Sequence, residues 1–293
     1  MLFRSKAHSR PEGDEFKICD ALGNILLTSD TATSGDPKDP KDVRPEIDRS
    51  VLRKIIVDAC PADSIKWGRA LVSATSNGDG THALTFSDGS TVVCDILVGA
   101  DGSNSRVRPL VSLARSEYSG VNGAEISLTP EVVAHPDMEE LRACVGHGTA
   151  FATSSGRSLG MQLNGDGRVR VYAWLRGPEE WVLPKDPTAG RAVLREIYAG
   201  WASWMLKVAN SCDEEAMYAR PLYHLPLDHR WAHVRGVTIL GDAVHLMSLF
   251  AGEGANLAMV ERLSLEWCWR AQLRGGRARR SARRLLRLGR TGG

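Results

Sequence analysis

A short apolar run that ends on a glycine and an acid constrains this chain most. The run VTIL, at 237–240, precedes Gly241 and Asp242, a loop that contains Gly252 and Gly254, and the apolar stretch ANLAM. A carboxylate at the end of a buried strand accepts hydrogen bonds from hydroxyl groups. Free N–H groups at a helix start favour negative charge. The stretch predicts either a ligand site or a plain strand–loop–helix connection with an accidental acid.

A second strand ends in the same manner within residues 96–108, which read ILVGADGSNSRVR. Its apolar run is typical of a strand buried on both faces. Asp101 and Gly102 then predict a tight turn, after which Ser103 or Ser105 can cap the following segment. Ligands often meet an acid and backbone N–H groups at the carboxyl end of a parallel strand. An Asp-Gly turn alone is more typical of ordinary structure than of a ligand site.

The remaining pattern indicates an α/β protein with antiparallel insertions. Apolar spacing predicts helices near 46–60, 188–210 and 255–271, the first with Asp48 as its cap. Alternation and turn residues predict hairpins over 16–28 and 160–174, and strands joined by tight turns over 70–99.

Composition narrows the class of protein. The 293 residues, 43% of them hydrophobic, suffice for one large or two modest domains. The sequence contains no stretch of about 18 apolar residues, so no membrane span is expected. The N-terminus has no apolar region of the kind found in secretory signals. The six scattered cysteines form no metal-binding spacing. We therefore expect free thiols, no metal and a cytoplasmic location.

Charge is concentrated at the C-terminal end. Nine of the 37 basic residues lie from Arg270 onward, with no acid, so residues 1–269 carry 28 basic against 35 acidic residues. The segment is interpreted as a disordered, arginine-biased tail. The alternative, a basic arm for nucleic acid, is disfavoured because no aromatic residues are interleaved with the arginines.

Together, GADGSNSRVR and GDAVHLMSLFAGEGANLAM, about 140 residues apart, resemble the FAD-dependent aromatic hydroxylases, the class A flavoprotein monooxygenases. RPEIDRSVLRKIIVDAC and IKWGRALV are most similar to the tetracycline-inactivating and salicylate-hydroxylase-like branch. The resemblance covers most of residues 16–267. It implies an α/β fold: an incomplete, Rossmann-like FAD-binding domain of the glutathione-reductase type with an inserted antiparallel-sheet substrate domain. The expected division is 1–110 (FAD-binding), 111–225 (substrate), 226–269 (FAD-binding) and the tail, 270–293.

The resemblance also implies roles for individual residues. Asp242, after Gly241, would accept hydrogen bonds from the FAD ribityl chain. Four residues would lie against the flavin and stabilise its reduced anion: Gly252, Gly254, Ala255 and Asn256. Arg49 would contact FAD, and Asp101 and Gly102 would serve both FAD and NAD(P)H.

The implied reaction is hydride transfer from NAD(P)H to FAD, followed by hydroxylation of an aromatic or polyketide-like small molecule by dioxygen through a flavin hydroperoxide. The cofactor carries the difficult step, so no side chain is assigned a catalytic role. Candidate substrate residues are Glu125 and, on one face of an alternating strand, Arg170, Tyr172 and Trp174. Their alternative is a role as ordinary sheet residues. His245 is interpreted as a loop histidine that is hydrogen-bonded to backbone.

Departures from the family suggest a second hypothesis. Leu249 stands where the family usually has proline, and VERLSLEW replaces an acid followed by small residues. The strand–GxGxxG–helix unit that grips the FAD pyrophosphate is absent from the sequence. A truncated, non-catalytic flavoprotein remnant would bind FAD weakly or not at all and would tend to aggregate.

Overall fold

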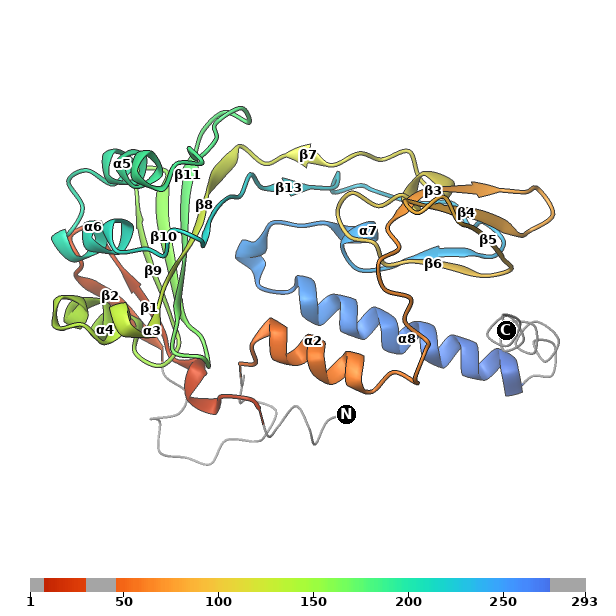
Figure 1. Cartoon of the computed structure of the whole chain (residues 1–293), viewed down its shortest axis with the longest axis horizontal. Helices are drawn as coiled ribbons and strands as arrows, with labels where there is room; N and C mark the ends of the chain where they lie inside the picture. The colour runs from red at the N-terminus through yellow and green to blue at the C-terminus, as the bar shows by residue number, and fades with distance from the viewer. Residues whose placement is uncertain (1–7, 30–45, 275–293) are drawn as a thin grey trace. The chain divides into compact units, whose positions relative to one another are not determined.

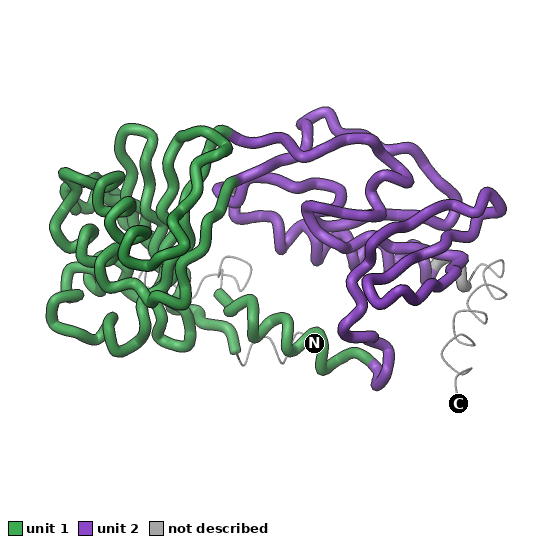
Figure 2. The backbone as a smooth tube through the Cα atoms, turned by 45° about the horizontal axis from the view of Figure 1, so that its top comes forward, with its two compact units in different colours: residues 1–60, 120–221 green, residues 61–119, 222–293 purple. Residues whose placement is uncertain are grey.

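The computed structural model describes residues 8–29 and 46–274, which form parts of two compact units. Unit 1 comprises residues 1–60 and 120–221, and unit 2 comprises 61–119 and 222–293 (Figure 2). The polar segment 30–45 and residues 275–293 of the expected tail lie outside the described residues. Residues 270–274 of that tail are not a separate segment, because they continue the last helix.

The described part of unit 1 is built around a seven-stranded sheet (Figure 1). Its strands, in spatial order, are β12 (Met217–Ala219), β8 (Val121–Leu128), β11 (Val169–Arg176), β10 (Arg157–Leu163), β9 (Thr149–Ser154), β1 (Phe16–Cys19) and β2 (Ile25–Ser29). Neighbours are antiparallel except β1 and β9. The two predicted hairpins are confirmed as β1–β2 and β10–β11.

Helices cover one face of this sheet and bury its apolar side chains. These helices are α3 (Pro130–Ala134), α4 (Glu139–Val145), α5 (Pro187–Ile197) and α6 (Ser203–Asn210), with the 3₁₀ turn η3 (Pro136–Met138). Unit 1 also contains α2 (Arg49–Asp58) and the 3₁₀ turn η1 (Pro11–Asp14), which contribute no side chain to this core. Ala124 and Ile126 of β8 pack with side chains of α4, α5 and α6 in one core. Because strand side chains alternate, Glu125 between them faces the opposite side.

Close packing between strands requires a glycine in the middle of this sheet. A Cβ atom at Gly123 would lie 2.1 Å from the backbone oxygen of Ala173 on β11. Any side chain at this position would push β8 and β11 apart, so the close approach of these two strands requires glycine at position 123.

Unit 2 contains smaller sheets among its described residues. An antiparallel sheet joins β3 (Leu71–Ser76), β4 (His82–Phe86) and β5 (Thr91–Cys94), as predicted. A parallel pair joins β6 (Leu97–Gly99) to β14 (Val237–Ile239), and an antiparallel pair joins β7 (Glu117–Tyr118) to β13 (Tyr223–His224). The helices and turns are η2 (Arg108–Leu110), α7 (Asp242–His245), η4 (Leu249–Ala251) and α8 (Gly254–Arg274).

The division into units differs from the expected boundaries. The expected FAD-binding segment 1–110 is split, because β1 pairs in parallel with β9, with Phe16 opposite Thr149, and so extends the sheet of unit 1. At the other boundary, β7 and β13 pair within unit 2, which limits the central segment of unit 1 to residues 120–221.

The predicted cap of α2 is wrong in its detail. Asp48 occupies the N-cap position, but its side chain makes no capping hydrogen bond. Its carboxylate instead accepts from the backbone N–H of Gly165, at 3.0 Å, and pairs with Arg10 at 3.4 Å. The acid therefore joins the start of the helix to the β10–β11 turn.

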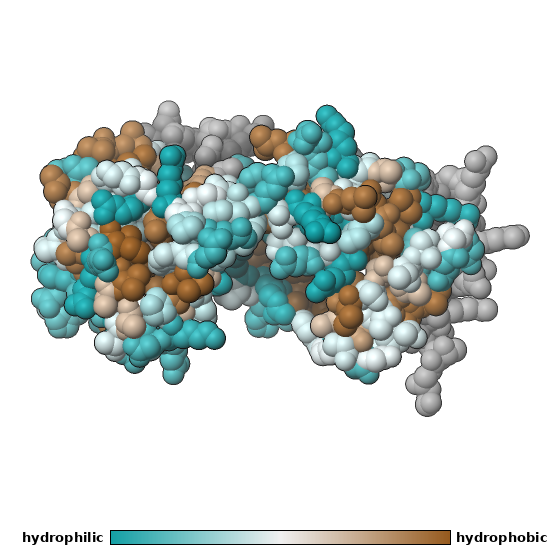
Figure 3. Space-filling model, turned by 90° about the horizontal axis from the view of Figure 1, so that it is seen from above, coloured by the Kyte–Doolittle hydropathy of each residue, from teal (hydrophilic) through white to brown (hydrophobic). Residues whose placement is uncertain are grey.

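Apolar side chains reach the surface in several places. On α8 the exposed large apolar residues are Leu257, Met259, Val260, Leu263 and Trp267. Figure 3 shows separate hydrophobic patches among hydrophilic surface on the face in view. Among the described residues, no helix combines the length and the apolar character needed to cross a membrane.

Candidate functional site

Two neighbouring strand ends in unit 2 bring the two sequence motifs together. β6 and β14 are parallel, with Leu97 opposite Val237 and Gly99 opposite Ile239. Asp101 follows the carboxyl end of β6, and Asp242 follows the carboxyl end of β14, so both acids lie at the same end of the strand pair. The sequence prediction that both motifs lie at carboxyl ends of parallel strands is confirmed by this register.

A buried arginine that the sequence analysis missed ties the motifs to each other. Arg108 is 5% exposed. Its Nε donates to the backbone oxygen of Ala243 at 2.7 Å, and its Nη2 donates to those of Ser103 at 2.7 Å and Asp242 at 3.2 Å. Burial lowers the pKa of the guanidinium, and the charge of Asp101 counteracts this. The only sequence signal was a basic residue inside the apolar run that follows the turn.

The carboxylate of Asp101 is engaged within its own turn. It accepts from the hydroxyl of Ser105 at 2.5 Å and from the backbone N–H of Arg106 at 2.7 Å. Of the two predicted caps, Ser105 is the one used, because its Oγ accepts from the N–H groups of Val107 and Arg108. Gly102 has a φ of +81°, and a Cβ there would have no neighbour within 4 Å. The turn thus presents open backbone at Gly102.

Asp242 has the opposite character. It is the first residue of α7 and follows Gly241, whose φ is +62°. Asp242 is exposed, and among the described residues its carboxylate has no hydrogen bond or ion pair. An acid that the fold positions but does not use can accept hydrogen bonds from ligand hydroxyls.

The glycine loop before α8 is open. Gly252 has a φ of +67°, and a Cβ at either Gly252 or Gly254 would meet nothing within 4 Å. Ala255 and Asn256 are exposed in the first turn of the 21-residue helix α8. Free N–H groups and the helix dipole make this turn suitable for an anionic group. An acid that can accept from hydroxyl groups and an open backbone at a helix start are both groups that could hold FAD, and the assignment of these residues to FAD stays a prediction.

Glu261 is a second residue that the sequence analysis missed. Its Oε2 accepts a hydrogen bond from the backbone N–H of Gly241 at 2.8 Å. The same oxygen lies 2.8 Å from Nε2 of His245. The interpretation of His245 as a loop histidine held by backbone is therefore wrong: it lies on α7 and contacts a carboxylate of α8. The only sign of Glu261 in the sequence was an acid in VERLSLEW, the stretch after the glycine loop that departs from the family pattern.

Arg49 belongs to unit 1. It is the first residue of α2, and its side chain is exposed. Its assignment to FAD remains a prediction.

The predicted substrate residues gather on the helix-free face of the sheet of unit 1. Oε1 of Glu125 lies 3.3 Å from Nη1 of Arg170, and Oε2 lies 2.8 Å from Nε of Arg220. The rings of Tyr172 and Trp174 are stacked, with centroids 5.6 Å apart and planes 2° apart. Trp174 is only 2% exposed, so it supports the ring of Tyr172.

Arg220 was not predicted, although it follows β12 directly. Its guanidinium lies 5.2 Å from the ring centroid of Tyr218. Tyr218, Glu125 and Tyr172 are register partners across β12, β8 and β11. The face therefore combines aromatic rings with two guanidinium groups around one carboxylate.

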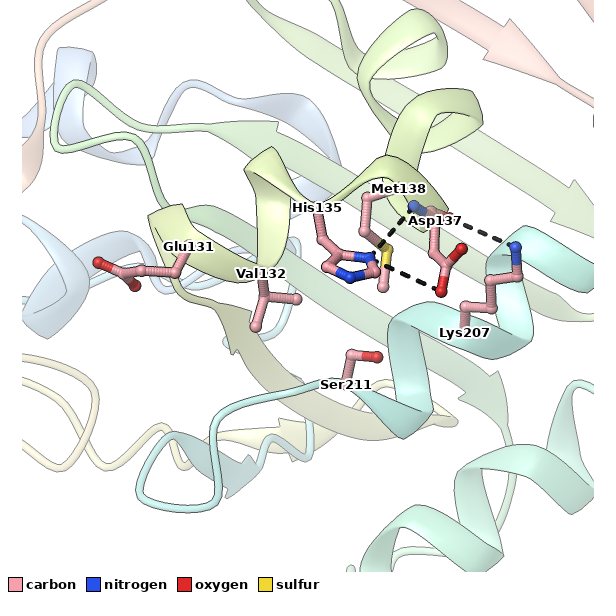
Figure 4. A pocket seen from close by; sticks show the side chains of 7 residues that line it. All are labelled: Glu131, Val132, His135, Asp137, Met138, Lys207 and Ser211. Carbon is pink, nitrogen blue, oxygen red and sulfur yellow. Dashed lines mark hydrogen bonds and ion pairs between the residues drawn. The ribbon is translucent and has the colours of Figure 1, made fainter.

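A separate cavity of about 450 Å³ lies among α3, η3 and α6 on the helix side of unit 1 (Figure 4). Nδ1 of His135 lies 3.6 Å from the carboxylate of Asp137, and Lys207 donates to the backbone oxygen of Asp137. None of the predicted site residues lines this cavity. Within the described ranges, no group of three or more metal-ligating side chains occurs.

Comparison with known proteins shows the family to which the chain belongs. The family model described as "FAD binding domain" matches residues 49–284. The chain belongs to this family of FAD-binding proteins.

Two curated relatives are fungal monooxygenases. Monooxygenase asqM of Emericella nidulans is 28% identical over 301 residues, and monooxygenase penA of Penicillium thymicola is 29% identical over 294 residues. The matches cover 86% and 85% of this chain but 65% of each relative. The chain thus spans about two thirds of the length of these relatives.

Solved structures share the fold. HpxO of Klebsiella pneumoniae, complexed with FAD and uric acid, superimposes with a TM-score of 0.69 at 22% identity, covering 86% of this chain and 62% of HpxO. A salicylate hydroxylase substrate complex gives 0.62 at 17% identity, covering 84% and 62%. Tetracycline destructase Tet(51) gives 0.58 at 20% identity, covering 88% and 63%. The predicted fold class and family are confirmed.

Proposed function

We propose that this chain holds FAD as part of an NAD(P)H-dependent monooxygenase that hydroxylates an aromatic or polyketide-like small molecule. The observation that carries the proposal is the unused carboxylate of Asp242 at the carboxyl end of β14, which Arg108 joins to the second motif. Membership of the FAD-binding family and likeness to named monooxygenases support it.

The residues of the chain would orient the cofactor. Asp242 accepts hydrogen bonds from ribityl hydroxyls, while the backbone of Gly252 and the first turn of α8 lie against the flavin ring and stabilise negative charge on it. Arg49 supplies a cation, and the open backbone at Gly102 serves FAD and the nicotinamide nucleotide. FAD bound here supplies the redox chemistry, taking hydride from NAD(P)H and activating dioxygen.

The helix-free face of unit 1 would bind the substrate. Tyr172, supported by Trp174, offers a flat surface on which an aromatic ring can stack. Arg170 and Arg220 together exceed the single charge of Glu125, which favours a substrate with acidic or enolic oxygens. The names of similar structures include uric acid and salicylate hydroxylase, and such flat, oxygen-rich molecules suit this surface.

The compartment is inferred from sulfur chemistry. All six cysteines lie within the described residues and are free. Free thiols are typical of a reducing compartment, which supports a cytoplasmic location.

A flavin titration tests the proposal. We expect the purified chain to quench FAD fluorescence saturably, with one FAD per chain, and to oxidise NADH or NADPH faster when a suitable phenol or enol is added. Saturable FAD binding without substrate-stimulated oxidation would instead identify a non-catalytic flavoprotein. Weak or absent FAD binding would contradict the proposal and would favour the truncated, non-catalytic remnant.

A further inference from the structure

Two buried thiols meet in unit 1, far from each other in sequence. The Sγ atoms of Cys19 and Cys144 lie 3.7 Å apart, across a separation of 125 residues. Cys19 ends β1 and is 0% exposed, and Cys144 lies near the end of α4 and is 4% exposed. Neither residue belongs to the proposed flavin or substrate surfaces.

Neighbouring contacts hold the two elements together beside the thiols. Lys17 Nζ donates to the backbone oxygen of Ala143 at 2.9 Å. The carboxylate of Glu15 accepts from the backbone N–H of His147 at 2.8 Å and pairs with Lys17 at 2.6 Å. Glu15, Lys17 and Cys19, which alternate along the chain, thus contact residues at or just after the end of α4. The two thiols are the buried part of this row of contacts.

We propose that Cys19 and Cys144 form an oxidation site that a peroxide converts to a disulfide. In the first step the Cys144 thiolate attacks one oxygen of hydrogen peroxide, giving a sulfenic acid and hydroxide. In the second step the sulfur of Cys19 attacks the sulfenic sulfur. The S–S bond forms, and the sulfenic oxygen leaves as water with the proton of Cys19. Two thiols are oxidised, and one peroxide is reduced to two waters.

The surroundings make the two thiols unequal. The hydrogen bond from Cys19 lowers the pKa of Cys144, burial opposes this, and the charge of Lys17 lowers it further. The same hydrogen bond, together with burial, raises the pKa of Cys19. Because the thiolate is the nucleophile, Cys144 attacks the peroxide and Cys19 resolves the product.

Geometry permits the bond with little movement. A disulfide requires about 2.05 Å between sulfur atoms, so the two sulfur atoms, which lie 3.7 Å apart, must approach by about 1.6 Å for the bond to form. The bond would join β1 covalently to α4 across 125 residues of chain. Such a closure restricts the unfolded chain, so we expect oxidation to raise the thermal midpoint of unit 1 by several degrees.

Peptide mapping of the full chain tests the proposal directly. The protein is treated with hydrogen peroxide, remaining thiols are alkylated, and peptides are analysed without reduction. The matched control is the double variant Cys60→Ser, Cys268→Ser, which lacks the two exposed thiols. We expect a Cys19–Cys144 peptide in both proteins. The proposal would be overturned if peroxide oxidises the exposed Cys60 and Cys268 while Cys19 and Cys144 are both recovered in alkylated form.

Trapping of the sulfenic acid tests the assigned order of attack. In Cys19→Ser, the serine hydroxyl can still donate to sulfur, and we expect dimedone to label Cys144 after peroxide treatment. In Cys144→Ser, we expect Cys19 to remain unlabelled. Label on Cys19 alone would overturn the order. If either variant fails to give the native circular dichroism spectrum, the unmodified chain is treated briefly with peroxide in the presence of dimedone, where label on Cys144 is expected and label on Cys19 would overturn the order.

Discussion

Nε of Arg108 donates a hydrogen bond to the backbone oxygen of Ala243 at 2.7 Å, joining segments 135 residues apart in the chain. A buried guanidinium satisfies three carbonyl groups here, including that of Asp242. The side chain that determines where Asp242 lies is therefore not itself at the ligand surface.

Arg108→Met is expected to weaken both folding and FAD binding. It leaves three carbonyl groups without their donor, each costing about 1–3 kcal/mol if it stays buried, so we expect a loss of at least about 3 kcal/mol in unfolding free energy. Urea unfolding followed by tryptophan fluorescence measures it. Arg106→Met, at an exposed neighbour, is the control, and an equal loss there would refute the specific role of Arg108.

Gly254→Ala separates cofactor binding from stability. The added Cβ meets no protein atom within 4 Å, so unfolding should be unchanged or slightly harder. The methyl group would occupy space needed by the flavin, and we expect FAD affinity to fall about tenfold, or about 1.4 kcal/mol. By contrast, a Cβ at Gly99 would lie 2.6 Å from that of Val107. The contrasting variant, Gly99→Ala, should therefore lower the unfolding free energy of unit 2 by about 1–3 kcal/mol.

The finding that would count against this account is an unaltered FAD affinity in Gly254→Ala. Such a result would mean that the flavin does not approach the start of α8.

Glu261 is expected to hold Gly241 in place for the neighbouring Asp242. Glu261→Ala removes the acceptor of the Gly241 N–H and the partner of His245, so FAD affinity should fall by roughly tenfold. Glu261→Gln keeps an acceptor oxygen and should retain most of the affinity. Isothermal titration with FAD compares the two variants. Equal affinities in both would show that the hydrogen bond to Gly241 is dispensable.

Acid should weaken unit 1 through Asp213. A hydrogen bond from Arg168 holds the pKa of Asp213 below its usual value. A folded pKa below the unfolded one gives stability that is present above about pH 4 and is lost as the pH falls through the folded pKa. Urea midpoints at pH 6 and pH 3 should therefore differ less in Asp213→Asn than in the native chain. Arg168→Met should show the same reduced difference, and an undiminished difference in both variants would exclude this pair as a cause.

The sequence was sufficient where local signals decide the structure. Alternation and tight turns gave the β3–β4–β5 sheet and the β10–β11 hairpin, because adjacent strands pair through short connections. It was also sufficient for the carboxyl ends of β6 and β14, since apolar runs followed by acids predict strand ends.

Contacts between distant segments were not predictable. The pairing of β1 with β9 depends on a match of surfaces about 130 residues apart, which moved the unit boundary. Asp48 had a local cap available, yet it bonds to Gly165 and Arg10. His245 contacts Glu261 because α8 returns beneath the strand end, and no periodicity within either segment indicates that approach.

The FAD affinity of Asp242→Asn tests the central claim most directly. The substitution keeps the size of the side chain but removes the charge that strengthens hydrogen bonds to hydroxyl groups, worth about 1.5–3 kcal/mol. We predict FAD binding at least about tenfold weaker than in the native chain, with unchanged urea unfolding, whereas Asp228→Asn, at another exposed acid of unit 2, should bind FAD normally. FAD binding that is equal in all three proteins, or absent from the native chain, would contradict the assignment of this site.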